Sequence, residues 1–200
     1  MILTLEEYYR EELPRMEYAK QYLLDLAEKF PAQHQLSGVE PILYCTSRIK
    51  SPDSMTAKLK LRGLPTDSAT ALTEVYDAVG IRVICSFLDD VYDVADWLCK
   101  QNLFRIITKK DYISWPKPNG YRSLHLILQF TEGKAEGLYA EIQIRTIAID
   151  FWAALEHQLK YKHTIKHEAT IRSELKRCAD EIASVDMSMQ TLRDIIREEK

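Results

Sequence analysis

Segment 111–125 (DYISWPKPNGYRSLH) holds the residues best suited to chemistry. Its prolines and its Asn-Gly pair are typical of a rigid turn, and that role needs no further function. A turn does not also require Lys117, Tyr121 and His125. A loop lysine, followed by an aromatic ring and a histidine at strand spacing, can bind a nucleotide's phosphates, stack on its base and hydrogen-bond its sugar. We therefore interpret the segment as part of a nucleotide site.

Two expected strands carry further polar residues beside this segment. In residues 121–130 and 138–146, apolar and polar residues alternate, as they do in strands that bury one face. The glycine-containing connector TEGKAEG suits a hairpin between them. If the apolar faces pack together, the opposite face is polar and forms a candidate cleft. Its side chains are Tyr121, Ser123, His125, Glu141, Gln143 and Arg145.

Two acidic residues are candidates for a metal site. Asp77 precedes a β-branched run at 80–87, and Glu141 lies in the second of the two strands. Carboxylates brought together at the edge of a sheet hold Mg²⁺ on substrate phosphates, because hard oxygen ligands suit this hard ion. Alternatively, the two carboxylates are unrelated, and the neighbouring Arg82 forms an ion pair with Asp77.

A basic cluster precedes these carboxylates. It consists of Arg48, Lys50, Lys58, Lys60 and Arg62. The Ser-Pro pair at 51–52 predicts a helix that begins there and extends to about residue 62. On that helix Ser54, Lys58 and Arg62 share one face, where two cations can clamp a polyphosphate. An ordinary solvated helix face would show the same pattern.

The remaining elements are expected from the periodicity of apolar residues. Strands are predicted where β-branched residues cluster, and helices where apolar residues recur every three or four positions. This alternation of periods indicates a mixed α/β domain. The predicted order is helices over 1–30 with Pro14 starting or kinking one of them, a loop over 31–45, a helix over 52–62, a strand over 80–87, a helix over 90–100, a strand over 104–109, the two strands above, and helices over 147–161 and 168–198.

The last predicted helix carries a heptad-like apolar seam. This seam either docks on the N-terminal helices of the same chain or mediates subunit assembly. Its residues are Ile171, Leu175, Cys178, Ile182, Val185, Met189, Leu192 and Ile196.

Composition excludes several classes of protein. The 200 residues, 46% of them hydrophobic, suffice for one core. A net charge of −3 does not suggest a nucleic-acid partner. The chain has no apolar run of about 18 residues and no basic leader, so neither a membrane span nor a signal peptide is expected. Four scattered cysteines without a CxxC pair fit a reducing cytoplasm.

Four ordered stretches resemble the synthetase domain of the RelA/SpoT alarmone enzymes, and in particular the stand-alone small alarmone synthetases. They are SRIKSPDSMTAKLKLRG, DAVGIRVICSF, DYISWPKPNGYRSLHLI and AEIQIRTIAIDFWAALEHQLKYK. The resemblance implies an α/β (α+β) fold with a mixed, nucleotidyltransferase-like sheet of about five strands flanked by helices. It also implies an N-terminal helical region (1–36), a catalytic domain (37–162) and a C-terminal oligomerisation helix (163–200).

The resemblance also implies a reaction, which is pyrophosphate transfer from ATP to the 3′-hydroxyl of GDP or GTP. Asp77 and Glu141 would bind Mg²⁺, or Mn²⁺ as an alternative, and Glu141 would act as the base. The chain contains no His-Asp pair, so no hydrolase activity is expected. The implied ATP site is Arg48, Lys50, Ser54, Lys58 and Arg62, and the implied GDP/GTP site is Lys117, Asn119, Tyr121, His125, Gln143 and Arg145.

Assembly and regulation follow from the same resemblance. The small members form homotetramers through terminal helices, which would give the apolar seam a use. The short chain predicts a synthetase without a hydrolase domain or regulatory tail. Tyr44, Thr46 and Asp150 would belong to a product-activation site, but an asparagine is usual at the third position, and a carboxylate there would repel an anionic product. The alternatives are a related nucleotidyltransferase with another acceptor and a non-catalytic alarmone-binding regulator.

Overall fold

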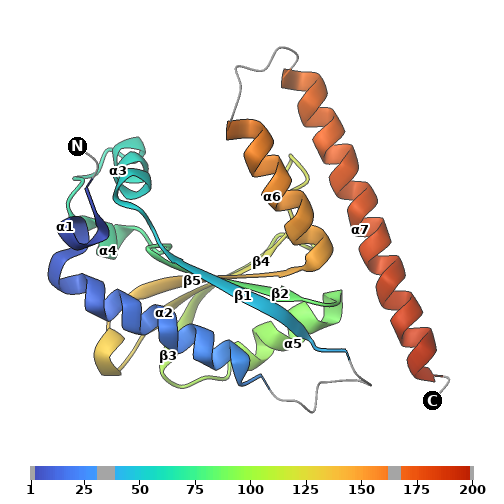
Figure 1. The fold of residues 1–200 in the computed structure, drawn as a ribbon, viewed down its shortest axis with the longest axis horizontal. Coiled ribbons are helices and arrows are strands. Elements are labelled where there is room, and N and C mark those ends of the chain that lie inside the picture. The colour runs from blue at the N-terminus through green and yellow to red at the C-terminus, as the bar shows by residue number, and fades with distance from the viewer. Residues whose placement is uncertain (1–2, 31–38, 162–167, 199–200) are drawn as a thin grey trace.

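The computed structural model describes residues 3–30, 39–161 and 168–198, and contains one five-stranded sheet with helices on both faces (Figure 1). This arrangement confirms the predicted mixed α/β fold. The strands are β1 Ile42–Ile49, β2 Val79–Cys85, β3 Phe104–Asp111, β4 Leu124–Phe130 and β5 Tyr139–Thr146. The helices are α1 Leu5–Tyr9, α2 Leu13–Glu28, α3 Pro52–Leu61, α4 Ser68–Glu74, α5 Leu88–Leu98, α6 Ile147–Tyr161 and α7 Glu168–Glu198, with 3₁₀ turns at Arg10–Glu12 and Gly133–Ala135.

The sheet has the order β1-β2-β5-β4-β3, in which only β2 and β5 run parallel. Residues directly opposite one another on neighbouring strands project to the same face. The register therefore forms two rows on one face. The first row is Arg48, Gly80, Glu141 and Ile127, and the second is Thr46, Arg82, Gln143 and His125.

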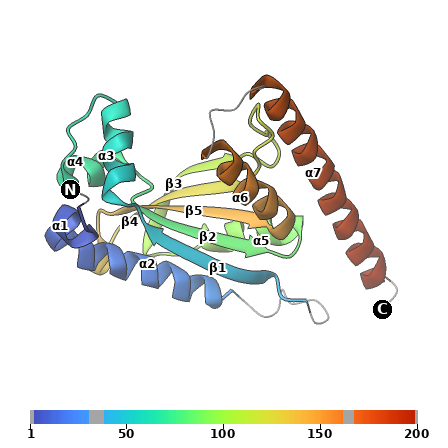
Figure 2. The same ribbon diagram turned by 45° about the horizontal axis from the view of Figure 1, so that its top comes forward.

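The opposite face of the sheet is apolar and carries the core. Helices α2 and α5 cover this face, whereas α6 lies across the polar face (Figure 2). Met16 and Leu23 of α2, and Val94 and Leu98 of α5, are at most 1% exposed. Burying each such side chain contributes roughly 1.5–3 kcal/mol to folding. The N-terminal helices thus belong to the same core as the sheet.

Local signals explain where several helices begin. Ser51 caps α3 by accepting a hydrogen bond from the backbone N–H of Ser54, and Pro52 occupies the first turn, as predicted. Pro14 opens α2 rather than kinking a longer helix. Asp67 caps α4 in the same way as Ser51 caps α3, although no helix was expected there from the sequence.

Two predictions about the strands are wrong. The loop predicted over 31–45 ends earlier, because β1 already begins at Ile42. β1 is an edge strand whose exposed and half-buried residues lack the expected apolar alternation. The strand predicted from Tyr121 begins instead at Leu124, because residues 112–123 form a folded-back loop closed by a hydrogen bond from the N–H of Tyr112 to the carbonyl of Ser123.

Of the two alternatives for the apolar seam, docking on the N-terminal helices is not seen among the described residues. Leu175, Cys178 and Ile182 pack against a buried cluster that contains Trp152 and Ala153 of α6. Helices α1 and α2 lie at the opposite end of the molecule (Figure 1). The second half of the seam is exposed, with Val185, Met189, Leu192 and Ile196 each more than half exposed. No helix among the described residues is long and apolar enough to span a membrane. The predicted domain boundaries after residues 36 and 162 fall in or at the edge of segments outside the described residues.

Candidate active site

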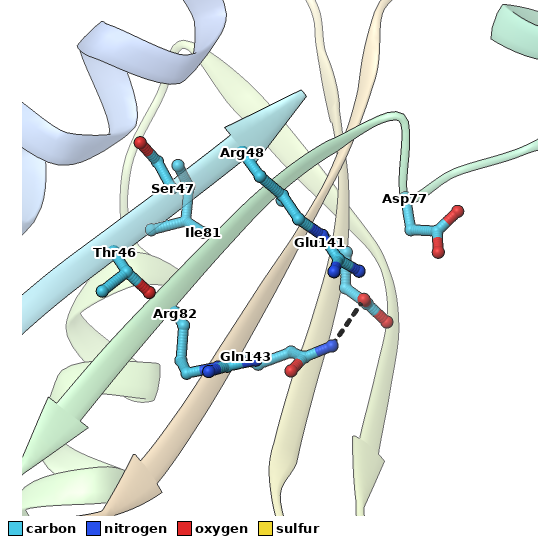
Figure 3. Close-up of a pocket in the computed structure, with 9 residues that line it drawn as sticks. Thr46, Ser47, Arg48, Asp77, Ile81, Arg82, Glu141 and Gln143 are labelled. Atoms are coloured by element: carbon cyan, nitrogen blue, oxygen red, sulfur yellow. Dashed lines mark hydrogen bonds between the residues drawn. The ribbon is translucent and has the colours of Figure 1, made fainter. Parts of the chain in front are cut away.

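The polar face of the sheet contains a cavity of about 170 Å³ between β1, β2 and β5 (Figure 3). Both predicted metal-binding carboxylates, Asp77 and Glu141, line it. They come from different elements, because Asp77 lies in the turn before β2 and Glu141 lies in β5. The full lining is Thr46, Ser47, Arg48, Asp77, Gly80, Ile81, Arg82, Glu141 and Gln143.

Gly80 lets a guanidinium reach across the sheet. It lies between Arg48 of β1 and Glu141 of β5 in the register. A Cβ atom on Gly80 would stand 3.5 Å from Cγ and 3.6 Å from Nε of Arg48. A side chain larger than alanine would therefore displace Arg48, which extends over β2 towards Glu141 (Figure 3).

Asp77 is held between two ammonium groups. Nζ of Lys50 lies 2.8 Å from its Oδ2, and Nζ of Lys58 lies 2.9 Å from its Oδ1. Burial alone would raise the pKa of Asp77, but the hydrogen bonds and charges of the two lysines outweigh it and lower the pKa. Asp77 is thus ionised and close to two cations that can also bind phosphate.

Glu141 is ionised for a different reason. Its Oε1 lies 3.0 Å from Nδ1 of His125, and its Oε2 accepts a 2.8 Å hydrogen bond from Gln143. Burial would raise the pKa of Glu141, but these two partners outweigh it and the pKa is lowered, while the charge of Asp77 opposes that lowering. Both oxygens of the carboxylate have fixed positions.

A closed ring of hydrogen bonds continues from Glu141 through four further side chains. The hydroxyl of Tyr121 lies 2.9 Å from Nε2 of His125. Nη2 of Arg145 donates to that hydroxyl at 2.6 Å and to Oε1 of Gln143 at 2.8 Å. The predicted polar face therefore exists, although Arg145 and His125 are buried at 4% and 7% exposure. The ring fixes the orientation of Glu141.

The two carboxylates fit a divalent cation. They are hard oxygen donors that line one cavity, and both are ionised. The charge of Asp77 opposes the lowering of the pKa of Glu141, and a cation between them would relieve that repulsion. Among the described residues, no group of three or more His, Cys, Asp and Glu side chains could hold a metal by itself. Substrate oxygens would have to complete the coordination.

The loop of segment 111–125 places Lys117 near the ring. Its Nζ lies 4.6 Å from the centroid of Tyr112 and 4.9 Å from that of Tyr121. The side chain of Asn119 turns away to donate to Glu156 at 3.0 Å. Lys117 and Tyr121 are thus together, whereas Asn119 braces the loop against α6.

The predicted donor-site residues separate into two groups. Arg48, Lys50 and Lys58 surround the cavity or its carboxylate. Arg62 instead donates to the carbonyl of Glu74 at 2.7 Å. The hydroxyl of Ser54 pairs with that of Ser51 at the start of α3. The predicted helix face therefore contributes mainly Lys58 to the site.

Sequence reasoning missed the roles of Arg82 and Tyr112. The proposed ion pair between Arg82 and Asp77 is not formed, because Arg82 lines the cavity and lies 3.4 Å from Asp150. The alternation within 80–87 puts Arg82 on the polar face, and this signal would have identified it. Tyr112 packs edge-on against His125, with centroids 5.2 Å apart. No strand pattern marks this loop residue.

Comparison with known proteins decides the family. Residues 47–166 match the family model described as a region found in RelA / SpoT proteins. The chain belongs to the RelA/SpoT family. This RelA/SpoT-family chain is 41% identical over 157 residues to the GTP pyrophosphokinase YwaC of Bacillus subtilis, covering 77% of this chain and 75% of YwaC. It is 33% identical over 162 residues to YjbM, another GTP pyrophosphokinase of that organism, covering 79% and 75%.

Solved structures agree with the family assignment. Small alarmone synthetase 2 of Bacillus subtilis matches with a TM-score of 0.81 and 36% identity, covering 93% of this chain and 98% of that chain. Small alarmone synthetase 1 of the same organism, bound to its product pppGpp, matches with a TM-score of 0.81 and 27% identity, covering 92% and 96%. These matches confirm the predicted resemblance of the RelA/SpoT-family chain to the small synthetases.

Proposed function

We propose that this chain is a GTP pyrophosphokinase that transfers pyrophosphate from ATP to the ribose 3′-hydroxyl of GDP or GTP. The observation that carries the proposal is that Asp77 and Glu141 line one cavity. Lys50 and Lys58 pair with Asp77, and the ring of hydrogen bonds that includes Tyr121 contains Glu141. Both Bacillus relatives are named GTP pyrophosphokinase. Phosphoryl transfer depends mainly on positioning and charge neutralisation, which such a site provides.

The donor half of the proposed site surrounds Asp77. Arg48, Lys50 and Lys58 supply three cations for the phosphates of ATP. Binding of a cation to Asp77 would free the two lysines, which could then pair with phosphate oxygens. Arg62 and Ser54 remain proposed ATP contacts that would need new side-chain conformations, because both now bond to other groups.

The acceptor half lies on the other side of Glu141. Tyr121 is proposed to stack on guanine, with Lys117 on the acceptor's phosphates. His125, Gln143 and Arg145 hold the tyrosine and the carboxylate in place. Asn119 would support this half by bracing the loop.

The proposed reaction needs one base and one leaving group. The 3′-oxygen of the acceptor bonds to the β-phosphorus of ATP, the bond between that phosphorus and the α–β bridging oxygen breaks, and AMP leaves. Glu141 takes the proton of the 3′-hydroxyl. Mg²⁺, with Mn²⁺ as an alternative, held by Asp77 and Glu141, would neutralise charge on the transferred phosphates.

The test is a reaction of purified protein with ATP, GDP and Mg²⁺. We expect ppGpp and AMP in equal amounts, resolved by ion-exchange chromatography, and none when EDTA replaces the metal. Parallel reactions with GMP, GTP and ADP as acceptors test the guanine preference. Product from a non-guanine acceptor alone would support the related nucleotidyltransferase. Nucleotide binding without AMP release would support the non-catalytic regulator.

We also propose that the chain forms homotetramers through its terminal helices. The support is apolar residues left exposed on α6 and α7. On α6 they recur every four residues and so share one helix face. These residues are Ile147, Phe151, Leu155 and Leu159 on α6, and Val185, Met189, Leu192 and Ile196 on α7.

A further inference from the structure

Asp150 is a buried carboxylate outside the cavity that joins three strands to α6. It lies in the first turn of α6 and is 9% exposed. Its Oδ1 lies 3.0 Å from Nη1 of Arg145 and 3.4 Å from Nη1 of Arg82. The hydroxyl of Tyr44 donates to its Oδ2 at 3.4 Å. These partners come from β5, β2 and β1 respectively.

The contact with Asp150 fixes the orientation of Arg145. Nε of Arg145 donates to the hydroxyl of Ser123 at 3.3 Å, and Nη2 donates to Tyr121 and Gln143. Among the hydrogen-bond partners of Arg145 in the described part of the chain, Asp150 is the one carboxylate. An arginine bound on opposite edges of its planar guanidinium has little freedom to rotate. Asp150 thus fixes the guanidinium of Arg145, which is one member of the ring of hydrogen bonds.

Asp150 also offsets repulsion between the buried guanidinium of Arg145 and the half-buried guanidinium of Arg82. Burial lowers the pKa of Arg82, and the charges of Arg145 and Arg48 lower it further, while Asp150 opposes the effect. Nε of Arg82 is buried and has no hydrogen-bond partner among the described residues. Without the carboxylate, the buried guanidinium of Arg145 would face that of Arg82 with no counter-charge from Asp150, which is costly for the buried partner.

We infer that Asp150 is a positioning residue, which holds Arg145 so that Tyr121 and Glu141 are oriented for the acceptor nucleotide. The inference rests on the proposed function. Asp150 does not line the cavity, so it acts through Arg145. It differs from the effector role that the family resemblance suggests, because the carboxylate is already neutralised by the protein's own cations.

The test compares variants of two buried carboxylates. Asp150→Asn keeps the shape but removes the charge, and Asp150→Glu keeps the charge. Asp186→Asn is the matched control, because Asp186 is 5% exposed and accepts a hydrogen bond from Thr146 without touching the ring. We expect Asp150→Asn to lower kcat/KM for GDP by about 10-fold to 100-fold, the range typical of residues that orient a site.

The pattern of kinetic constants separates positioning from general stability. KM for ATP should change less than KM for GDP, and Asp150→Glu should recover part of the loss. Thermal unfolding of each variant shows whether it is folded. Equal activity of Asp150→Asn and wild type would overturn the inference, as would equal losses in Asp150→Asn and Asp186→Asn. An inactive wild-type enzyme would instead refute the proposed function.

A chemical rescue provides an independent measurement. Asp150→Ala should leave a gap between Arg82 and Arg145 that formate can enter. We expect formate to raise kcat/KM of Asp150→Ala severalfold relative to chloride at equal ionic strength, and to leave Asp186→Ala unchanged. GDP binding, followed by calorimetry without ATP, should recover in parallel. No effect of formate on either activity or GDP binding would count against Asp150 as a source of positioned charge.

Discussion

His125 and Glu141 are joined by a 3.0 Å hydrogen bond between Nδ1 and Oε1. Because an ionised carboxylate only accepts hydrogen bonds, Nδ1 carries the proton. Nε2 of His125 lies 2.9 Å from the hydroxyl of Tyr121, which in turn accepts from Arg145. Tyr121, the proposed stacking residue, and Glu141, the proposed base, therefore belong to one hydrogen-bonded unit. Substitution of either should affect both GDP binding and turnover.

Glu141→Gln tests the proposed base directly. The substitution keeps the shape of the side chain but removes the proton acceptor and one of the two proposed metal ligands. We expect kcat to fall by at least about 10²–10⁴-fold, the usual contribution of a general base. Circular dichroism and thermal unfolding should show a folded protein, because Glu141 faces the cavity. Retention of more than a tenth of wild-type kcat would exclude the role of base.

Tyr121 offers a pair of substitutions that separate stacking from hydrogen bonding. Tyr121→Ala removes the ring and should raise KM for GDP by the equivalent of about 1–3 kcal/mol, the scale of base stacking on an aromatic side chain. Tyr121→Phe keeps the ring but loses the contacts with His125 and Arg145. It should lower kcat more than it raises KM. Steady-state kinetics with varied GDP give both constants, and an unchanged KM in Tyr121→Ala would argue against stacking.

The apolar alternation of β4 and β5 was readable from the sequence because one face of each strand is fully buried. Leu124, Leu126, Leu128 and Ile142 are at most 1% exposed. That pattern also placed Glu141 on the opposite face. The edge strand β1 carries no such signal, because most of its residues are exposed or half-buried, and its first four residues were therefore predicted as part of a loop.

Long-range partners were the part that the sequence did not reveal. The pairing of Asp77 with Lys50 and Lys58 depends on how α3 lies against the turn before β2, and no local spacing encodes that packing. Arg82 likewise pairs with Asp150 and not with Asp77, which lies closer to it in the sequence. Asp150 was identified only through the family resemblance, and its contacts with β1, β2 and β5 come from the fold.

Phe151→Glu tests the proposed assembly. Phe151 is 59% exposed in the described chain, so a charge there should leave the folded subunit intact but prevent burial against another copy. Light scattering coupled to size-exclusion chromatography should show a tetramer for wild type and a smaller species for the variant. Leu61→Glu, at a position 89% exposed at the end of α3, is the control and should retain the wild-type mass. A monomeric wild type would refute the proposed tetramer.

Asp77→Asn should change how stability depends on pH. The pKa of Asp77 is lower in the folded protein than its ordinary value of 3.8. Its ionised form therefore stabilises the fold above about pH 4, and that contribution is lost as pH falls through the folded-state pKa. The variant should be less stable than wild type at pH 7, and the difference should shrink on acidification. Urea unfolding at several pH values between 3 and 7 measures it, and a difference that grows at low pH would contradict the sign.

Gly120→Ala should destabilise the loop that carries Tyr121. Gly120 has φ +88°, and a Cβ atom there would lie 2.7 Å from Cβ of Ala179 in α7. The left-handed backbone costs an alanine about 1 kcal/mol, and the forced displacement of α7 adds about 1–3 kcal/mol. Gly137→Ala is the matched control, because Gly137 has φ +83° with no atom within 4 Å of the added Cβ. Urea unfolding should show the larger loss for Gly120→Ala, and KM for GDP should rise only in that variant. Equal losses would mean that α7 does not brace the loop.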